Sequence, residues 1–210
     1  LQRSVRELAE RLIIPNARRW DQEEVFPHEI IPAMGEMGLL GMQIPEEYGG
    51  AGMKFFDYVV ALEEIARADA SVGLTMASHN SLCTGHLYLA GSEAQRKKYL
   101  PKLATGESIG CFGLTEPGAG SDPGSMRTKA EKVADGYRLS GAKMWITNAP
   151  IADVMVVWAK TEDGVIRVFV LERGMTGLST PKIEGKFSLR ASVTGEIVMQ
   201  NVEVPEANLL

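Results

Sequence analysis

Cysteine is scarce in this sequence. Cys83 and Cys111 are the two cysteines among 210 residues, too few for the disulfide framework that stabilises small secreted domains. Both lie in apolar surroundings, so we interpret them as small core residues of a protein from a reducing compartment.

Long apolar runs and concentrations of positive charge are also missing. No run approaches the roughly 20 apolar residues that a membrane-spanning helix needs, and nothing resembles a signal peptide. The formal net charge is −5, and lysine and arginine are spread along the chain. This distribution argues against a nucleic-acid partner or an anionic membrane surface. The residues that are present, 45% hydrophobic and 23% charged, have the balance of a folded globular protein.

The first half of the sequence has the periodicity of helices. Apolar residues recur at helical spacing over 5–12, 30–37, 55–65 and 72–89. Pro15 is predicted to kink or end the first helix, because proline lacks a backbone donor. Ser92 and Gln95 match a capping box, which places another helix at about 92–103.

The second half has the pattern of strands. Short β-rich runs alternate with turn signals over 109–114, 126–133, 137–140, 143–147, 154–160, 166–172, 178–182 and 194–204. A helical block followed by a strand block indicates two segregated domains rather than a βαβ fold. We therefore predict an α+β protein, with an N-terminal all-α helical domain in residues 1–105 and an antiparallel β-barrel domain in residues 106–210.

A loop dense in glycine and proline follows the first predicted strand, with the sequence LTEPGAGSDPG over 114–124. Glycines let the backbone approach a ligand and aim N–H groups at it, while Thr115 and Ser121 add hydroxyls. This chemistry suits a phosphate or the polar edge of a heterocycle. The loop is neither a G-x-G-x-x-G motif nor a Walker loop, so an ordinary glycine-rich turn is an equal alternative on these grounds alone.

A second segment of interest is the predicted strand KMWITN, residues 143–148. Strand alternation places Trp145 and Thr147 on one face, where a flat ring could stack near the first and accept a hydrogen bond from the second. The alternative is a barrel-core tryptophan with a surface threonine.

Together, the TEPGAGSD loop at 115–122 and the KMWITN strand resemble the acyl-CoA dehydrogenase family. The segments IPEEYGGAG at 44–52, 95–103 and VEVP at 202–205 match that family's landmarks in the same order. The resemblance spans nearly the whole chain, and the combination of motifs is highly specific.

The resemblance implies an FAD seated against the barrel. By motif match, the residues that would line it are Phe112, Leu114, Thr115, Gly120, Ser121, Trp145, Ile146 and Thr147. Thr115 would lie at the pyrimidine edge, and Ser121 would lie near the pyrophosphate and the bound thioester, which makes it a substrate-binding residue too. The residues at 145–147 would cover one flavin face, with Thr147 hydrogen-bonded at the reactive nitrogen.

The family's reaction removes an α-proton with a glutamate while the β-hydrogen leaves as hydride to the flavin, giving a trans-2-enoyl-CoA. That glutamate belongs to the family's C-terminal four-helix bundle, which we expect to be absent from this chain, so no catalytic residue is assigned. Weak or absent FAD retention follows. The resemblance also implies an acyl-CoA substrate, electron-transferring flavoprotein as acceptor, and a homotetramer or homodimer. The location would be cytoplasmic in a bacterium and the mitochondrial matrix in a eukaryote.

None of the chain's carboxylates is promoted to the role of base. Glu116 is expected to belong to the loop scaffold. Glu46, Glu47, Glu63 and Glu64 are expected on solvated faces.

Two further features have a structural and a functional interpretation. His79, Cys83 and His86 share one helical face by spacing, which suits either a metal site or, as we favour, core residues. Arg190 is interpreted as a structural ion-pair residue, with a CoA contact as the alternative.

Substrate and activity stay open at this point. The segment 185–195 looks like that of glutaryl-CoA dehydrogenases, whereas 77–83 looks like that of short-chain members. His28 stands where a glutaryl enzyme is expected to carry a carboxylate-binding arginine. A non-catalytic binding or assembly piece and an acyl-CoA oxidase relative are the alternatives to a dehydrogenase.

Overall fold

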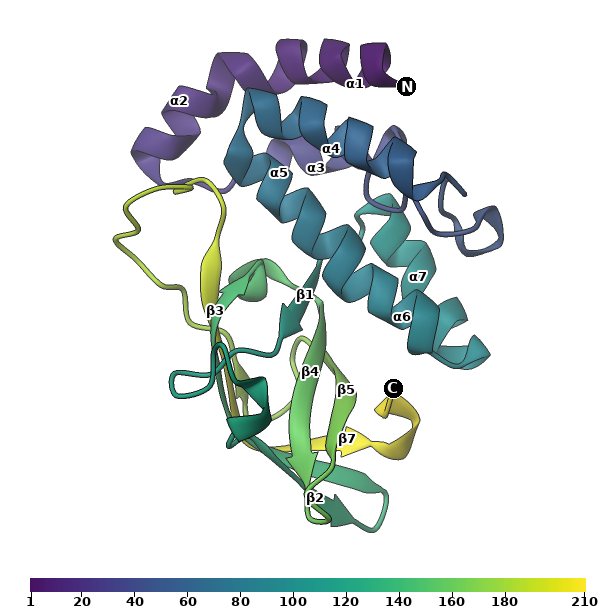
Figure 1. Ribbon diagram of the computed structural model, residues 1–210, viewed down its shortest axis with the longest axis vertical. Coiled ribbons are helices and arrows are strands. Elements are labelled where there is room, and N and C mark those ends of the chain that lie inside the picture. The colour runs from purple at the N-terminus through teal and green to yellow at the C-terminus, as the bar shows by residue number, and fades with distance from the viewer.

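The computed structural model describes residues 1–210 and consists of a helical half stacked on a curled sheet (Figure 1). The N-terminus lies at the outer end of the helical half, and the C-terminus lies beside the sheet near α6. None of the helices combines the length and apolar content needed to cross a bilayer.

Seven α-helices form the upper half. They are α1 (Gln2–Leu8), α2 (Ile14–Glu23), α3 (Ile31–Glu36), α4 (Phe55–Ala68), α5 (Ala70–Ala77), α6 (Gly85–Ala90) and α7 (Glu93–Thr105). The predicted capping box begins α7, because Gln95 N–H donates to Ser92 Oγ at 3.3 Å and Ser92 N–H donates to Gln95 Oε1 at 2.7 Å. Gly106, with φ 77°, ends it in a left-handed conformation.

Two π-helical segments join neighbouring α-helices without a break. Ala9–Ile13 lies between α1 and α2, and Ser78–Thr84 lies between α5 and α6. Pro15 therefore does not end the first helix. It occupies the first turn of α2, directly after the π-helical segment, and the helical path bends there (Figure 1).

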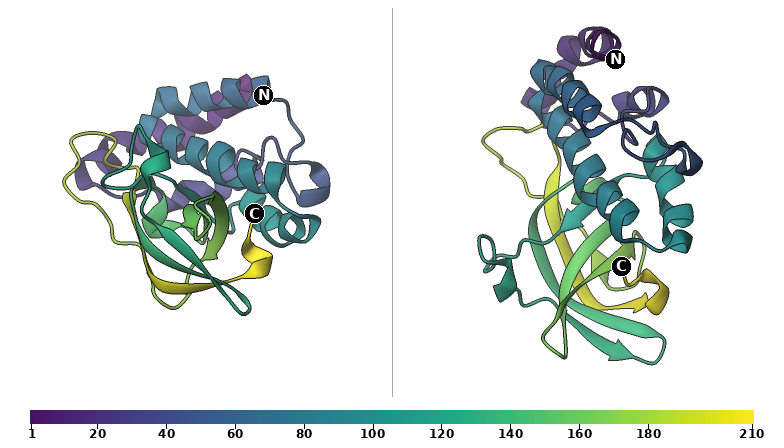
Figure 2. Two further views of the ribbon diagram at one scale, coloured as in Figure 1. Left: turned by 60° about the horizontal axis from the view of Figure 1, so that its bottom comes forward. Right: turned by 45° about the vertical axis from the view of Figure 1, so that its right-hand side comes forward.

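The lower half is one curled, seven-stranded sheet. Its strands are β1 (Gly110–Gly113), β2 (Lys129–Val133), β3 (Gly136–Thr147), β4 (Val154–Thr161), β5 (Ile166–Glu172), β6 (Leu178–Ser179) and β7 (Thr194–Pro205). The hydrogen-bonded order is β1-β4-β2-β3-β7-β6, and β5 pairs with β4. Seen from another side, the strands curl around a common interior (Figure 2).

The prediction of an antiparallel barrel was wrong in one respect, because the sheet is mixed. β1 runs parallel to β4, with Gly110 opposite Val154, and the end of β2 also runs parallel to β4. The remaining pairs are antiparallel. The chain enters the sheet from α7 through β1. Its partner β4 follows much later in the sequence, and no local pattern reveals such a pairing.

Three clusters of buried apolar residues make up the core. One lies within the helices and one within the sheet. The third is shared, since Cys83, Leu100 and Leu103 of the helical half join Val156 and Val170 of the sheet. The two halves are therefore fused through a common core.

The expectation that Glu64 lies on a solvated face was wrong. Its side chain is 3% exposed and accepts hydrogen bonds from Arg6 Nη2 at 2.6 Å and Gln2 Nε2 at 2.8 Å. The bond from Arg6 lowers the pKa of Glu64 to about 2 despite its burial. An ion pair between α1 and α4 allowed this carboxylate to face inward, whereas Glu46, Glu47 and Glu63 are exposed.

Candidate functional site

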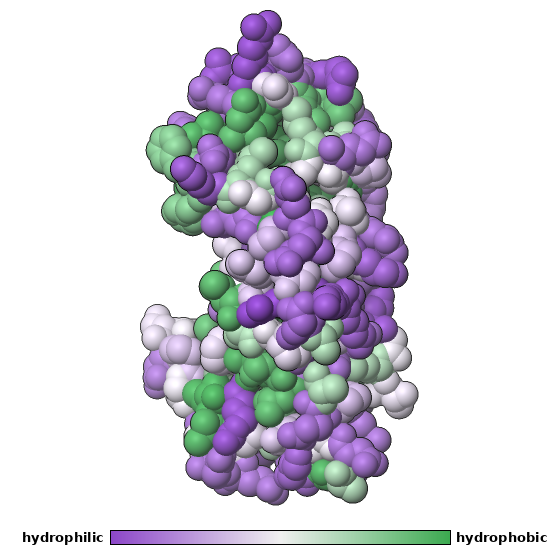
Figure 3. Space-filling view, turned by 90° about the vertical axis from the view of Figure 1, so that its right-hand side faces the viewer, coloured by the Kyte–Doolittle hydropathy of each residue, from purple (hydrophilic) through white to green (hydrophobic).

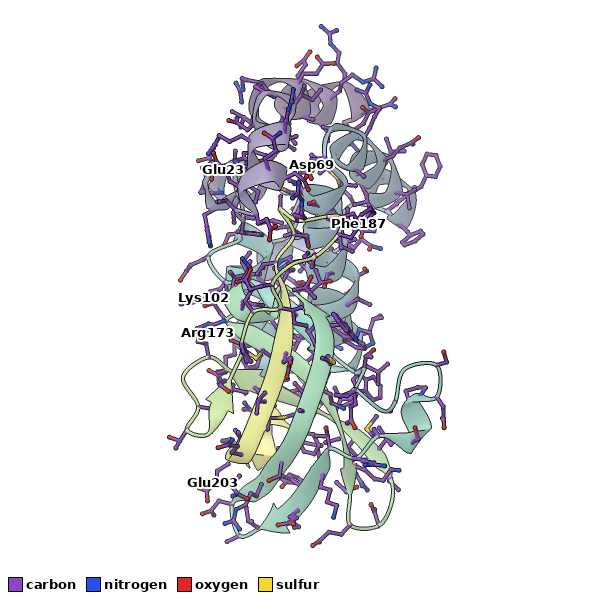
Figure 4. The ribbon with its side chains drawn as sticks, turned by 90° about the vertical axis from the view of Figure 1, so that its left-hand side faces the viewer. Glu23, Asp69, Lys102, Arg173, Phe187 and Glu203 are labelled. Atoms are coloured by element: carbon purple, nitrogen blue, oxygen red, sulfur yellow. The ribbon has the colours of Figure 1, made fainter.

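The glycine-rich loop between β1 and β2 is closed at its base by Glu116. The Glu116 carboxylate accepts hydrogen bonds from Arg127 N–H at 2.6 Å, Thr128 N–H at 3.0 Å and Thr128 Oγ1 at 2.5 Å. Burial opposes the charge of Glu116, but these bonds and the ammonium of Lys143 hold its pKa at about 2. Residues 117–126 thus form a projection clasped by one carboxylate, visible in Figure 4 as the loop that leaves the sheet.

The loop is bonded directly to β3. Lys143, fully buried, places its Nζ 2.7 Å from Glu116 Oε1 and 3.1 Å from the carbonyl oxygen of Leu114. The next residue, Met144, donates its N–H to Thr115 O at 2.9 Å. The structure therefore brings the two segments singled out from the sequence into contact.

Trp145 has an unusual backbone conformation for a bulky residue. Its φ is 63°, in the left-handed region that is strained for side chains of this size. The β3–β7 register shifts between Lys143 and Ile146, so Trp145 occupies a β-bulge. Trp145 is 58% exposed. Bulges of this kind often re-aim a side chain beside a functional site.

The other predicted site residues lie around this junction. Thr115 and Thr147 are half-buried and Ser121 is exposed, so their hydroxyls are available to a ligand. Gly120 has open space where a Cβ would point and is not among the glycines with positive φ. The fold itself therefore gives no reason for glycine there, whereas close approach of a ligand to the backbone would.

The apolar residues of the predicted site divide into two kinds. Phe112 and Leu114 are half-buried, and Phe112 also contacts the rings of His86 and Trp158 at centroid distances of 4.9 Å and 6.1 Å. Ile146 is 4% exposed and belongs to the barrel core. Its backbone, rather than its side chain, is what this residue can offer a ligand.

These features fit a flat, polar-edged ring with an attached diphosphate. An exposed indole at a bulge supplies a stacking surface, and hydroxyls and glycine N–H groups supply hydrogen bonds to ring edges and phosphate oxygens. Figure 3 shows a recess at one edge of the molecule between its helical part and its sheet.

The His79, Cys83 and His86 face has a structural explanation. His79 Nδ1 accepts Gly110 N–H at 3.0 Å and its Nε2 lies 2.9 Å from Leu103 O, so both ring nitrogens are used by the backbone. Burial lowers the pKa of His79 to about 4. No group of three His, Cys, Asp or Glu side chains with metal-binding geometry is found in residues 1–210.

Lys143 is the site residue that sequence reasoning missed. A lysine in a strand is ordinarily expected to reach solvent, yet this one is 0% exposed. The signal was present in the alternation of β3, because Leu139 and Lys143 are separated by an even number of residues and both point inward. A carboxylate for it to pair with was available in the loop at Glu116.

Comparison with protein families identifies both halves of this arrangement. The model described as "Acyl-CoA dehydrogenase, N-terminal domain" matches residues 1–107, and "Acyl-CoA dehydrogenase, middle domain" matches residues 111–202. The chain belongs to the acyl-CoA dehydrogenase family. Members of this family use FAD as cofactor, in agreement with the cofactor that the motifs implied.

Individual proteins are similar to this one over nearly its whole chain. The mitochondrial isovaleryl-CoA dehydrogenase of Solanum tuberosum is 44% identical over 99% of this chain and 52% of its own length. A glutaryl-CoA dehydrogenase of Mycobacterium smegmatis, solved with FADH2, superposes with a TM-score of 0.95 at 39% identity, covering 99% of this chain and 53% of that one. A chain described with the electron transferring flavoprotein of Acidaminococcus fermentans gives a TM-score of 0.96 at 39% identity, with 100% and 56% covered.

The chain spans about half the length of the relatives it matches. Its α-helices all precede Gly106, so no C-terminal helical bundle lies within residues 1–210. What these residues contain is the helical domain and the sheet on which the glycine-rich loop and Trp145 are mounted.

Proposed function

We infer that residues 1–210 form the flavin- and thioester-binding half of an FAD-dependent acyl-CoA dehydrogenase, which converts an acyl-CoA to a trans-2-enoyl-CoA. The observation that carries the inference is the junction of the 114–124 loop with β3, where hydroxyls, glycine N–H groups and an exposed Trp145 share one surface. We assign residues 1–105 to a helical domain and 106–210 to the sheet domain.

Each side chain of this surface has a proposed role. Trp145 would stack against one face of the isoalloxazine ring, and Thr147 would donate a hydrogen bond at the reactive nitrogen. Thr115 would bond the pyrimidine edge, and the loop at Gly120 would hold the pyrophosphate. Ser121 would contact both the pyrophosphate and the thioester. When bound, FAD supplies the acceptor for the hydride from the substrate's β-carbon.

The proton at the α-carbon requires a base that this surface does not supply. A general base must have a free lone pair within hydrogen-bond reach of the proton it removes. Glu116, the buried carboxylate nearest to the loop, is committed to Lys143 and Thr128 and serves as an anchor. We propose that the base comes from the part of the enzyme that corresponds to the C-terminal half of the relatives.

The test is a flavin titration followed by an activity assay. The 210-residue chain should quench flavin fluorescence on titration with FAD but lose the flavin on dialysis, and it should not reduce a dye with any acyl-CoA. The same residues within a protein of the relatives' full length should retain FAD and reduce the dye. Absence of flavin from that longer protein would refute the proposal.

A non-catalytic binding piece is the second candidate, favoured by the commitment of Glu116 to the fold. It predicts no dye reduction even in the longer protein with excess FAD. An oxidase would instead release hydrogen peroxide during turnover.

Substrate and partners follow from the relatives as proposals. The similar proteins act, by their names, on isovaleryl-CoA and glutaryl-CoA, so a short acyl-CoA is the substrate class to test first. His28 is exposed and packs edge-on against Phe26. It could supply a positive charge to the second carboxylate of a dicarboxylyl substrate only when protonated. Electron-transferring flavoprotein is the proposed acceptor and a homotetramer or homodimer the proposed assembly. The potato relative is mitochondrial, which suits a matrix location in a eukaryote and the cytoplasm in a bacterium.

A further inference from the structure

We propose that Glu116 and Lys143 are a positioning pair, which sets the glycine-rich loop and Trp145 at the separation that the flavin requires. The inference deepens the proposed function and rests on it. Neither residue needs to touch the cofactor, because both act through the backbone segments that they join.

The pair connects consecutive residues on both sides of the junction. Lys143 holds Leu114 O and the Glu116 carboxylate, and Met144 N–H holds Thr115 O between them. Three consecutive loop residues are thus bonded to two consecutive strand residues. The bulge that carries Trp145 follows Lys143 directly. The contacts of Lys143 and Met144 with the loop therefore fix the position of the Trp145 side chain relative to the loop.

Glu116 also fixes the far end of the loop. Its two oxygens receive bonds from Arg127 and Thr128, so one carboxylate joins both ends of 117–126 to β3. Gly118 and Gly120 inside this loop have no atom within 4 Å of a would-be Cβ. Within the loop, Ala119 is buried and Lys160 Nζ donates to Gly124 O at 2.9 Å, but the bonds that fix both ends of the loop to β3 are those of the pair.

Stability alone is a poor explanation for this pair. Glu116 is 6% exposed and Lys143 is fully buried, and taking two charges out of water offsets much of their attraction. Apolar residues of similar volume often do as well in a buried position. What such residues cannot do is hold a carbonyl oxygen and two backbone N–H groups at fixed positions.

The experiment uses the full-length protein and four variants. Glu116→Gln alone leaves a buried charge unpaired and is expected to lower the melting temperature. Glu116→Gln combined with Lys143→Met removes both charges, and Thr128→Val removes only one bond to the carboxylate. Glu64→Gln is the matched control, because Glu64 is also a buried, multiply bonded carboxylate but lies in the helical half.

Three quantities are measured: the melting temperature, the FAD dissociation constant, and the fluorescence of flavin at saturation. We expect the double variant to melt near the wild type yet bind FAD at least about tenfold more weakly, with incomplete quenching of the bound flavin. Thr128→Val should show a smaller change in the same direction. Glu64→Gln should melt earlier but bind and quench FAD as the wild type does.

Two outcomes would overturn the proposal. One is a double variant or, if that does not fold, a Thr128→Val variant with wild-type affinity and quenching. The other is a Glu64→Gln variant that weakens FAD binding as much as Glu116→Gln, since affinity would then follow general stability. A wild type that binds no FAD would refute the proposed function instead. In that case the positioning role of the pair is tested by the amide exchange rates of residues 117–126 in flavin-free protein. Unchanged rates in the Thr128→Val and double variants would contradict that role.

Discussion

Arg190 in the loop before β7 is bonded to Asp21 at the end of α2, 169 residues away in the sequence. Arg190 Nη2 lies 2.7 Å from Asp21 Oδ2, and Arg190 N–H donates to Asp21 Oδ1 at 3.2 Å. The predicted ion pair of Arg190 is confirmed, but it bridges to the helical half. The loop that carries it reaches upward from the sheet in Figure 1, and Figure 4 labels Phe187, fully exposed, on this loop.

Removing this bridge should free the loop without unfolding the protein. Arg190→Met is expected to change the melting temperature little, because partly exposed pairs contribute about 0.2–1 kcal/mol. Limited proteolysis within 183–191 should become faster. Arg138→Met, which removes an exposed pair with Glu203, is the control and should leave that rate unchanged. Equal cleavage of both variants would show that Arg190 does not hold the loop.

The strained backbone of Trp145 gives a prediction in which stability and function separate. Trp145→Ala and Trp145→Gly both remove the exposed indole, but only glycine adopts a positive φ without strain. The glycine variant should be more stable than the alanine variant by about 1 kcal/mol, measured by urea unfolding. Both should lose most of the quenching of bound flavin. Equal stability of the two variants would mean that the φ of 63° is not retained in solution.

Acid should destabilise the fold in two steps. Burial lowers the pKa of His79 from 6.5 to about 4, so the unfolded chain binds this proton more readily than the folded one. The contribution of neutral His79 to the free energy of unfolding, on the order of 3 kcal/mol, is fully present above pH 6.5 and is lost as the pH falls towards 4. Glu64 and Glu116, each with a pKa lowered from 4.5 to about 2, add a second loss of stability between pH 4.5 and 2.

Urea unfolding at a series of pH values measures both steps. The variant His79→Gln should be less stable than the wild type at pH 7, yet its stability should vary little between pH 6.5 and pH 4.5. A wild-type protein with constant stability across that interval would contradict the assignment to His79.

The two thiols should be unreactive in the folded protein. Burial raises the pKa of Cys83 to about 12 and that of Cys111 well above its ordinary value, and only the thiolate is nucleophilic. A thiol reagent at pH 8 should therefore label neither cysteine until denaturant is added, and then both. Rapid labelling of native protein would show that the helical half opens away from β1.

Local signals predicted most of the elements but not their pairing. Ser92 and Gln95 marked the start of α7 because a capping box is a contact between neighbours in sequence. Residues 137–140 and 143–147 were predicted as two strands, yet they form the single strand β3. Its register with β7 shifts between Leu139 and Gly141 and again between Lys143 and Ile146. The parallel pairing of Gly110 with Val154 depends on residues 44 positions apart, which periodicity does not encode.

The site was predicted by its motifs, whereas its support was not. Glycines, hydroxyls and Trp145 form a recognisable string of letters, and the structure brings them together. Lys143 escaped notice because its burial depends on a carboxylate 27 residues earlier. Glu64 did so for the same reason, since its partners Gln2 and Arg6 lie in another helix. Ion pairs between residues distant in sequence could not be predicted from local sequence patterns.

The shared cluster of Cys83, Leu103, Val156 and Val170 bears on how such a protein can be divided or inherited. A cut after Thr105 would leave each piece with half of a hydrophobic interface exposed to water, an invitation to aggregate. Melting should accordingly be one transition, with helices and sheet lost together. Recombination between relatives at this boundary would succeed only where both parents fill the same interface with side chains of matching volume. Residues 1–210 look like two domains, but they would then unfold as one cooperative unit and be inherited together.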